Sequence, residues 1–527
     1  FLFIMVSRNL LVYGWVQVLY VCSISYSKNV YNLNLPMEHI PLFFNNHPKA
    51  SEKCQMDLKC PYKMHLGHKV CWGYEENCSA QDKYVNSVCP GDHKGWASSK
   101  KEQIELFHKQ GDFGYVKERR NSLEKICTPV QSGYAYLACS QHLHFCVGKH
   151  IWMNLTDLVR YRHESLKYST SILKHGDIGA VCRLDPGKLK TSRNHQSSLQ
   201  SWSPELQNFV EMKNDSIGTN LCDVVINRPA IIMKLDATVS MYHHFCDFFN
   251  LYASLHVNNS EENTFTTDTQ IIIWDNAPYR SNFLEAFKPF SRNPLMNLAD
   301  LMGKKVCFRD LMLPMPPRML FGLYYNTPLI NGCFKSGLFH AFNRFMLHRM
   351  KIPYRTKVGS DVVKVTFLSR KTQYRRVLNE DELLSALRRR KSLSVEKAVY
   401  HWDTNFKDQV NSTHHTDILI GLHGSGLTHL MFLPDWAVVI ELHNCGDEHC
   451  YLDLARLRGV EYLTWEDQEK VKVEMGHHPE LKGPHPKFAN YIFDTEAFLR
   501  LLTKAEALVR SNKEWRFVRG YPLKDEL

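Results

Sequence analysis

The sequence predicts an α/β fold in which two Rossmann-like domains face a cleft, behind a cysteine-rich and mainly helical N-terminal extension. Three observations support this expectation. The chain has 527 residues, enough for two or three domains with separate cores. From about residue 221 onward, short apolar runs alternate with helical stretches, as in a parallel sheet with crossover helices. Residues 418–422 form an uninterrupted apolar run that ends in a glycine loop, a pattern typical of a buried strand in a nucleotide-binding unit.

The two ends of the chain indicate the secretory pathway. Residues 1–25 are expected to be a signal peptide, because Arg8 precedes an apolar stretch that is too short to span a bilayer comfortably. No later segment reaches 18 apolar residues, so we expect no membrane span. The chain ends in the retrieval signal of the endoplasmic reticulum, Lys524, Asp525, Glu526 and Leu527. These features predict a protein of the endoplasmic reticulum lumen that is bound by the KDEL receptor.

The number and density of cysteines are typical of a protein from an oxidising compartment. Nine of the 16 lie between Cys54 and Cys182, and Cys445 and Cys450 are close enough to pair locally. No Cys-x-x-Cys occurs, which disfavours a thioredoxin-type redox site and a zinc ribbon. Asn-x-Ser/Thr sequons, some of which we expect to carry glycans on the surface, begin at Asn77, Asn154, Asn214, Asn258 and Asn411.

The charge of the chain does not indicate a nucleic-acid partner. The formal net charge is +11 at pH 7, but the basic residues are scattered. Their densest run, residues 388–391, is expected to be the solvated end of a helix.

The N-terminal region, residues 26–220, is irregular in pattern, with helices expected over residues 101–109 and 113–126. Two Rossmann-like halves with a cleft between them would place a donor molecule on one side and an acceptor molecule on the other. Residues 221–345 are expected to form the first of these domains, on the acceptor side. Its expected strands and single helix are residues 223–226, 230–235 and 271–274, and residues 241–257.

Residues 346–480 are expected to form the second Rossmann-like domain, which binds the donor. Its strands are predicted at residues 362–368, 393–400, 418–422 and 438–442. Helices are predicted at residues 379–390, where Asn379 is the N-cap, at residues 406–414 and from Leu427 onward. Residues 481–527 are expected to be a C-terminal segment that carries the retrieval signal.

The glycine loop after residues 418–422 consists of His423, Gly424, Ser425 and Gly426. A strand that ends in such a loop and opens a helix leaves backbone N–H groups unpaired at a positive dipole end, which can hold a phosphate. The alternative is a purely structural turn between strand and helix.

Two arginines follow the predicted strand at residues 362–368. Arg370 and Arg375 could hold a diphosphate with forked hydrogen bonds, because ligands of parallel sheets bind beyond the carboxyl ends of the strands. A solvated basic loop is the alternative. Glu441, at the end of the last predicted strand, could bind ribose hydroxyls or be an ordinary charge at a strand end.

Histidines and a carboxylate lie together at the start of the predicted helix 241–257. His243 and Asp247 are four residues apart and share a helix face, with His244 beside them. A carboxylate can orient an imidazole, or either group can accept a proton, although most such pairs are structural. Asp236 is the only nearby third ligand for a metal, which makes a metal site a weak prediction.

Several of these segments together resemble glycosyltransferase family 61. The residues that carry the resemblance are 60–63, 242–247, 324–329, 423–429 and 450–459, so it covers nearly the whole chain after the signal segment. It implies an inverting enzyme of the GT-B type that transfers GlcNAc from UDP-GlcNAc to Ser or Thr of folded EGF-like repeats, such as those of Notch receptors. Asp247 or His243 would then be the base, with His244 in reserve, and Arg370, Arg375 and residues 424–426 would stabilise the departing UDP.

One element of the family is missing. Its members carry an Asp-x-Asp between the first strands and the segment around Lys304, and this sequence has no Asp-x-Asp anywhere. That element usually holds a metal ion on a nucleotide diphosphate. Without it, no residue pattern in this sequence calls for a metal cofactor, and whether the enzyme uses a divalent ion stays an open alternative. The rival interpretation is a catalytically weak or inactive lumenal protein that binds EGF-like repeats.

Overall fold

The protein is described by a computed structural model. The described residues are 33–91, 97–130, 135–213, 221–259, 262–324, 332–353, 361–401, 403–442, 449–477, 483–484 and 488–520. The predicted signal peptide, Asn214, Cys445 and the retrieval signal lie outside these ranges. None of the helices that the structure describes has the length and apolar character needed to cross a bilayer.

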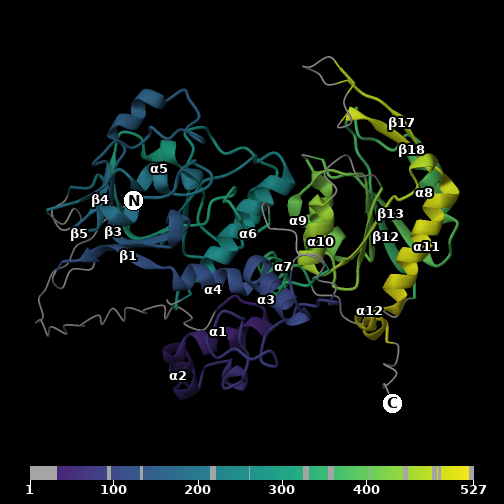
Figure 1. Cartoon of the computed structure of the whole chain (residues 1–527), viewed down its shortest axis with the longest axis horizontal. Helices are drawn as coiled ribbons and strands as arrows, with labels where there is room; N and C mark the ends of the chain where they lie inside the picture. Colours follow the sequence, from purple (N-terminus) through teal and green to yellow (C-terminus); the bar gives the residue numbers. More distant parts are fainter. Residues whose placement is uncertain are drawn as a thin grey trace, which may run out of the picture.

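A mixed eleven-stranded sheet forms the first half of the molecule (Figure 1). Its main path runs β10-β9-β8-β11-β3-β2-β1-β5, with β4, β6 and β7 attached at the side. The strands are β1 (Glu124–Pro129), β2 (Tyr136–Cys139), β3 (Cys146–Asn154), β4 (Ile178–Ala180), β5 (Cys182–Leu184), β6 (Phe209–Glu211), β7 (Val224–Ile226), β8 (Ala230–Met233), β9 (Gln270–Ile273), β10 (Met296–Asn297) and β11 (Lys305–Leu313). β8, β9 and β10 are parallel and fully or partly buried, and helix α6 (Met241–Val257) connects β8 to β9.

This sheet corrects the expected boundary near residue 220. β3 pairs antiparallel with β11 along nearly its whole length, so strands from the N-terminal region and from the first α/β unit share one sheet. Among the described residues of the region, the α-helices longer than one turn lie near its start: α1 (Ile40–Asn46), α2 (Pro48–Met56), α3 (Lys100–Gly111) and α4 (Phe113–Asn121), whereas α5 (Ser203–Leu206) is a single turn near its end. The helix predicted over residues 113–126 ends early because residues 124–129 enter β1, where Cys127 is disulfide-bonded to Cys182 of β5.

The second sheet has five parallel strands in the order β13-β12-β14-β15-β16. They are β12 (Val363–Leu368), β13 (Leu393–Ala398), β14 (Ile418–Gly421), β15 (Val438–Glu441) and β16 (Glu461–Thr464). Along the chain this is the order 2-1-3-4-5 of a doubly wound nucleotide-binding sheet. Helices α9 (Phe406–His414) and α10 (Cys450–Arg458) lie on one side, and α8 (Glu380–Arg388) and α11 (Thr495–Ser511) lie on the other (Figure 1).

The C-terminal residues belong to this second unit instead of forming a separate segment. Phe498, Leu502 and Val509 of α11 and Trp515 of the following helix α12 (Lys513–Val518) share its buried core with β12, β14 and β15. A short hairpin of β17 (Val471–Glu474) and β18 (Asn490–Phe493) extends the same unit. The expected boundary at residue 480 therefore runs through one core.

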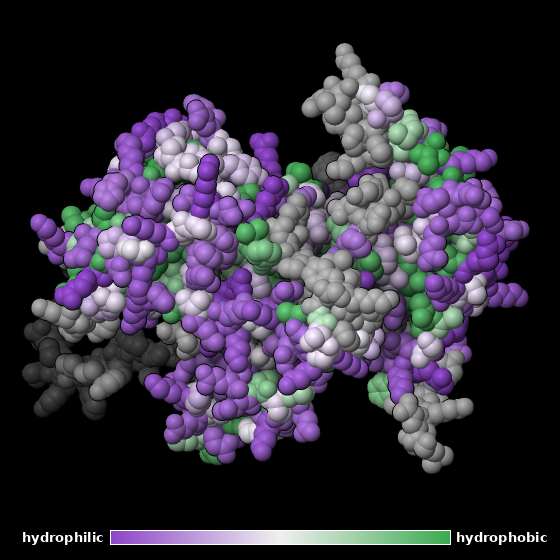
Figure 2. Space-filling model, viewed as in Figure 1, coloured by the Kyte–Doolittle hydropathy of each residue, from purple (hydrophilic) through white to green (hydrophobic). Residues whose placement is uncertain are grey.

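Helices from both halves meet between the two sheets. α6, α7 (Gly337–Arg349), α10 and the 3-10 helix η9 (Ser425–Phe432) contribute to one hydrophobic cluster, which also takes in Trp72 and Phe107 of the N-terminal region. η9 replaces the α-helix that was predicted from Leu427 onward. On the face shown in Figure 2, the coloured surface is mostly hydrophilic, with separate apolar patches.

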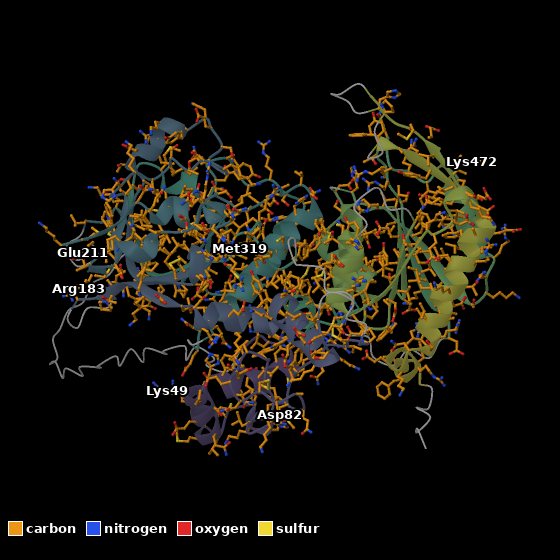
Figure 3. The ribbon with its side chains drawn as sticks, viewed as in Figure 1. Lys49, Asp82, Arg183, Glu211, Met319 and Lys472 are labelled. Atoms are coloured by element: carbon orange, nitrogen blue, oxygen red, sulfur yellow. A yellow bond between two sulfur atoms is a disulfide. The ribbon has the colours of Figure 1, made fainter. Side chains whose placement is uncertain are left out.

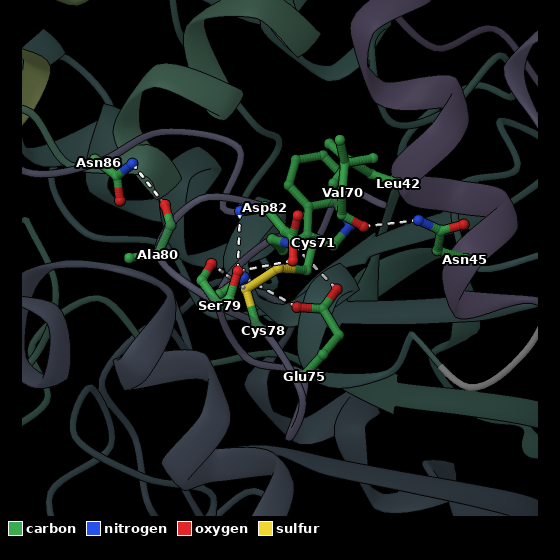
Figure 4. Close-up of a disulfide and its surroundings, with 12 residues drawn as sticks. Leu42, Asn45, Val70, Cys71, Glu75, Cys78, Ser79, Ala80, Asp82 and Asn86 are labelled. Atoms are coloured by element: carbon green, nitrogen blue, oxygen red, sulfur yellow. Dashed lines mark hydrogen bonds between the residues drawn. A yellow bond between two sulfur atoms is a disulfide. The ribbon is translucent and has the colours of Figure 1, made fainter. Parts of the chain in front are cut away.

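Six disulfides connect twelve of the fourteen described cysteines: Cys54–Cys60, Cys71–Cys78, Cys89–Cys333, Cys127–Cys182, Cys139–Cys146 and Cys222–Cys307. This number fits an oxidising secretory compartment. Figure 4 shows the Cys71–Cys78 bond beside Glu75, whose oxygens accept hydrogen bonds from Asn46 and from the backbone N–H groups of Trp72 and Gly73. Because both sulfurs and both carboxylate oxygens are engaged, this cluster of potential ligands is structural.

Candidate functional site

The first group of site residues lies where the second sheet changes direction. In the order β13-β12-β14-β15-β16, the chain winds one way from β12 and the other way from β14. Ligands of doubly wound sheets bind at the point between two such strands. Arg370 and Arg375 follow β12, and Gly424 follows β14. A Cβ atom at Gly424 would collide with Nη1 of Arg370 and lie 3.4 Å from Nη1 of Arg375. The structure thus brings both predicted arginines to the predicted glycine loop.

The glycine at position 424 is needed for this approach. Its φ of 153° is one that other residues rarely adopt, and the missing side chain leaves space for the guanidinium groups. Ser425 and Gly426 begin η9, so their backbone N–H groups are at the positive end of a short helix. Cations and N–H donors at one point form a suitable site for a diphosphate.

His423 of the glycine loop is partly buried and pairs with the buried Glu441. Nδ1 of His423 lies 2.5 Å from Oε1 of Glu441, and the hydroxyl of Tyr462 donates to Oε2. Both carboxylate oxygens are therefore engaged by protein groups, and Glu441 is almost fully buried. This arrangement favours a carboxylate that positions His423 over the direct ribose contact that the sequence suggested.

His429, which also flanks the glycine loop, belongs to the core. Its Nδ1 lies 2.8 Å from the carbonyl oxygen of Gly426 and its Nε2 lies 3.1 Å from Oε1 of Gln409. Burial lowers the pKa of His429 to about 4, so the ring is neutral at pH 7.

The second group of site residues lies at the start of α6 and contains two His–Asp pairs. In the inner pair, Nδ1 of His244 lies 2.8 Å from Oδ2 of Asp247, and Nε2 of His244 lies 2.6 Å from the hydroxyl of Tyr279. Neither side chain of the pair is exposed to solvent. Burial raises the pKa of Asp247, although the bond from His244 opposes the shift. An enclosed pair of this kind positions its neighbours and cannot reach a substrate hydroxyl.

In the outer pair, the histidine is accessible and the aspartate is buried. Nδ1 of His243 lies 3.2 Å from Oδ2 of Asp236, and the guanidinium of Arg318 donates to both oxygens of Asp236, with distances of 2.9 Å and 2.8 Å. The side chain of His243 is 28% exposed, whereas that of Asp236 is 1% exposed. Burial would raise the pKa of Asp236, but the bonds from His243 and Arg318 outweigh it and lower the pKa to about 2. Asp236 is therefore a fixed anion that can orient the His243 imidazole.

The two pairs are coupled through the backbone. The N–H of Asp236 points at the carboxylate of Asp247, at 3.2 Å and 3.3 Å from its two oxygens. The buried pair thereby holds the loop that carries Asp236, and Asp236 in turn holds His243. Of the three residues predicted to be catalytic, the geometry singles out His243 as the one that can contact a substrate.

Aromatic rings connect the α6 group to the glycine loop. The ring of Tyr242 lies 5.8 Å from that of His243 and 5.6 Å from that of Tyr451 in α10. Tyr451 in turn lies 5.2 Å from His423. In Figure 1, α6 lies beside α9 and α10, between the two sheets. The base candidate and the phosphate-binding candidate thus border a common aromatic cluster, although they come from different halves of the chain.

Sequence reasoning missed several residues of the site. The sequence gives no role to Arg318, Tyr279 or Tyr462, includes Tyr451 only as part of the segment 450–459, and suggests Asp236 only as a metal ligand. No local signal marks Arg318, Tyr279 or Tyr462, because each contacts a residue that is distant along the chain. Asp236 is only seven residues before His243, a spacing that does not fit a helix face because residues 237–240 precede α6. Among the described residues, the only group of His, Cys, Asp and Glu close enough to hold a metal ion is the structural cluster around Cys71.

The predicted glycosylation sites differ in their surroundings. Asn77 and Asn411 are exposed, as a glycan requires. Asn258 is half-buried at the end of α6. Asn154 is half-buried as well, and its amide nitrogen donates to Asp177 at 2.9 Å while its oxygen accepts from Thr156. A glycan at Asn154 would replace one hydrogen of the amide nitrogen that donates to Asp177.

Comparison with known proteins agrees with the geometry. The model of the family "Glycosyltransferase 61" matches residues 241–440, which begin at α6 and end within β15. The chain is 46% identical over 484 residues to the EGF domain-specific O-linked N-acetylglucosamine transferase of Drosophila melanogaster, with 92% of each chain covered. It is 43% identical over 504 residues to the enzyme of the same name from Bos taurus, which covers 95% of this chain and 93% of the relative. For the Mus musculus enzyme the identity is 43% over 502 residues. The chain is therefore a glycosyltransferase that belongs to family 61.

Proposed function

We propose that this enzyme transfers GlcNAc from UDP-GlcNAc to a Ser or Thr hydroxyl of folded EGF-like domains, with inversion, in the lumen of the endoplasmic reticulum. The observation that carries the proposal is the convergence of Arg370 and Arg375 on Gly424 at the switch point of a parallel sheet. The names of the relatives supply the sugar and the acceptor class. In this proposal the second unit, built on the five-stranded sheet, binds the donor. The first unit, built on the eleven-stranded sheet, faces the acceptor, and a GT-B-type cleft lies between the two units.

In the proposed mechanism the base is His243, the accessible member of the outer His–Asp pair. His243 removes the proton of the acceptor hydroxyl while the oxygen attacks the anomeric carbon of GlcNAc. The bond from that carbon to the β-phosphate oxygen breaks, and UDP departs with the electron pair. Asp236 fixes the orientation of the ring and stabilises the imidazolium that forms, as a carboxylate does in other His–Asp pairs. Arg318 holds Asp236 in place.

The charge that develops on UDP is stabilised from the second unit. Arg370 and Arg375 supply fork-shaped cationic donors, and the N–H groups at the start of η9 supply further donors. His423, held by Glu441, lies beside them. These groups neutralise a diphosphate by themselves, so the proposal requires no cofactor besides the donor and leaves a contribution of a divalent metal to experiment.

The test is an incubation of the purified protein with UDP-GlcNAc and a folded EGF-like domain. We expect the acceptor to gain the mass of one N-acetylhexosamine. An acceptor with its Ser or Thr residues replaced by Ala, and the same domain reduced and alkylated, serve as controls that should gain nothing. If the folded domain binds but gains no mass, even with Mn²⁺ or Mg²⁺ added, the chain is a binding protein and the proposed activity is wrong. Transfer from another nucleotide sugar alone would correct the donor.

A further inference from the structure

A second concave region lies next to the proposed base. The segment after β11 carries Arg318, which bonds Asp236, then Met319, which is buried, and then Leu320 and Phe321, which line a pocket of about 620 Å³. In Figure 3, Met319 is in the interior of the first unit. One short stretch of chain therefore borders the catalytic pair on one side and this pocket on the other.

The pocket combines an apolar edge with polar walls. Its apolar edge is Phe321, whose side chain is 65% exposed. The opposite walls come from Lys109 of α3, Arg119 of α4 and a histidine cluster in which the rings of His142 and His195 stack 3.9 Å apart. Burial lowers the pKa of His142 and of His195, so both rings are neutral near pH 7 and the charge of the pocket is set by its fixed groups.

Those fixed groups leave a positive balance. Glu118 is the acidic residue of the lining, and it is shared by Lys109 at 3.0 Å and Arg119 at 3.3 Å. Two cations thus face one carboxylate. A ligand that carries a further carboxylate and an apolar group matches this lining.

Two further exposed side chains with apolar surface belong to segments near the base. Val239, between Asp236 and the start of α6, is 82% exposed. Tyr168 is 55% exposed and close enough to Asp236 and Arg318 to be affected by their charges. Together with Phe321, these residues come from three separate segments around one catalytic pair. A surface of this composition is typical of a place where a protein partner docks.

We infer that the surface formed by Tyr168, Val239 and Phe321 docks the folded acceptor domain. One loop of that domain enters the pocket, with an apolar side chain against Phe321 and a carboxylate towards Lys109 and Arg119. The inference rests on the proposed function: an acceptor hydroxyl that reaches His243 brings the body of a folded domain over the residues around it. Docking at this pocket would also explain how an enzyme can recognise a folded domain and not only a short sequence around the modified hydroxyl.

The experiment compares Phe321→Ser with Phe517→Ser, a matched change at an aromatic residue of α12 that is 57% exposed. Both proteins are assayed with UDP-GlcNAc and a folded EGF-like domain, and the binding of that domain is measured directly in the presence of UDP. Phe321→Ser should raise the acceptor KM and the acceptor Kd about tenfold, the effect expected of a well-packed interface aromatic. The KM for UDP-GlcNAc, the affinity for UDP and the melting temperature should not change, and Phe517→Ser should match the parent protein.

A charge variant tests the polar wall. Lys109→Glu should weaken acceptor binding and make it less sensitive to salt, whereas Lys472→Glu, on β17 at the far end of the second unit (Figure 3), should have no effect.

The outcomes separate this inference from the proposed function. If the parent protein transfers GlcNAc and both Phe321→Ser and Lys109→Glu retain the parent values for the acceptor, the docking site is elsewhere and the inference is wrong. If the parent protein transfers nothing, the proposed function fails first. An equal loss of donor affinity and acceptor affinity in Phe321→Ser would also contradict a docking role, because it would indicate a general disturbance of the site.

Discussion

Replacing Asp236 by Asn tests whether this buried carboxylate positions the proposed base. The carboxylate accepts bonds from His243 and from two nitrogens of Arg318. These partners outweigh burial and lower its pKa from 3.8 to about 2. A carboxyl group whose pKa is lowered on folding contributes stability that is present above the unfolded pKa and is lost as the pH falls through the folded one. The shift corresponds to roughly 2 kcal/mol at pH 7.

An asparagine at this position keeps the shape of the side chain but removes the charge. We therefore expect Asp236→Asn to lower the free energy of unfolding by roughly 2 kcal/mol at pH 7 in urea denaturation. We also expect kcat to fall by a factor of about 10² to 10⁴, because the imidazole loses the group that orients it and stabilises its protonated form. The affinity for UDP, which is bound by the other unit in the proposal, should stay the same.

The control is Asp157→Asn, at an aspartate whose side chain is 52% exposed and pairs with Lys174 and Arg160. Such a surface pair contributes little, so this variant should behave like the parent protein in both assays. An Asp236→Asn protein that keeps its kcat within a factor of two would refute the reasoning, even if its stability falls as expected. The carboxylate would then be a structural partner of Arg318 and not part of the catalytic pair.

Three further predictions follow from contacts elsewhere in the chain. Arg370→Ala should weaken UDP binding by roughly 2 to 5 kcal/mol in calorimetry. Arg370→Lys should restore little of this binding energy, because lysine lacks the forked donors of arginine. The control is Arg388→Ala, at an exposed arginine at the end of α8, which should have no effect. Burial, aided by Arg120, lowers the pKa of His256 from 6.5 to about 3, so stability should fall as the pH drops below 6.5. His256→Phe should remove roughly 2 kcal/mol of that loss between pH 7 and pH 5, measured by urea denaturation, and an unchanged pH dependence would contradict it. Removing Cys89–Cys333 with paired serines should cost roughly 5 kcal/mol, against roughly 2 kcal/mol for Cys139–Cys146, because the closed loops span 244 and 7 residues. Equal losses of melting temperature for the two pairs would argue against the loop-entropy explanation.

The parts of the fold that depend on local sequence were predictable. α6 occupies residues 241–257 as expected, and the apolar runs near residues 365 and 420 are β12 and β14. Such runs identify buried parallel strands without knowledge of their neighbours. The position of the glycine loop was predictable as well, since the loop directly follows the end of β14.

Pairing between distant segments was not predictable in the same way. β3 has no strong apolar run, and its place in the first sheet is determined by β11, which follows it by more than a hundred residues. Arg318 and Asp236 are 82 residues apart, so nothing near either residue marks the contact. Glu441 could be placed at a strand end from the sequence, but Tyr462, which engages it, belongs to the next parallel strand. Side-chain partners across a sheet depend on the strand order, which the hydrophobic pattern alone does not give.

The disulfide between Cys89 and Cys333 has a consequence for the synthesis of the protein. At about 5–20 residues per second, roughly 10 to 50 seconds pass between the translation of Cys89 and that of its partner. During this interval the Cys89 thiol is in the same short region as the cysteines at 54, 60, 71 and 78, which could capture it. Their own partners lie only 6 or 7 residues away, so those two bonds can close as soon as the chain emerges. Early closure of the two small loops would remove these four thiols as competitors for Cys89 long before residue 333 arrives.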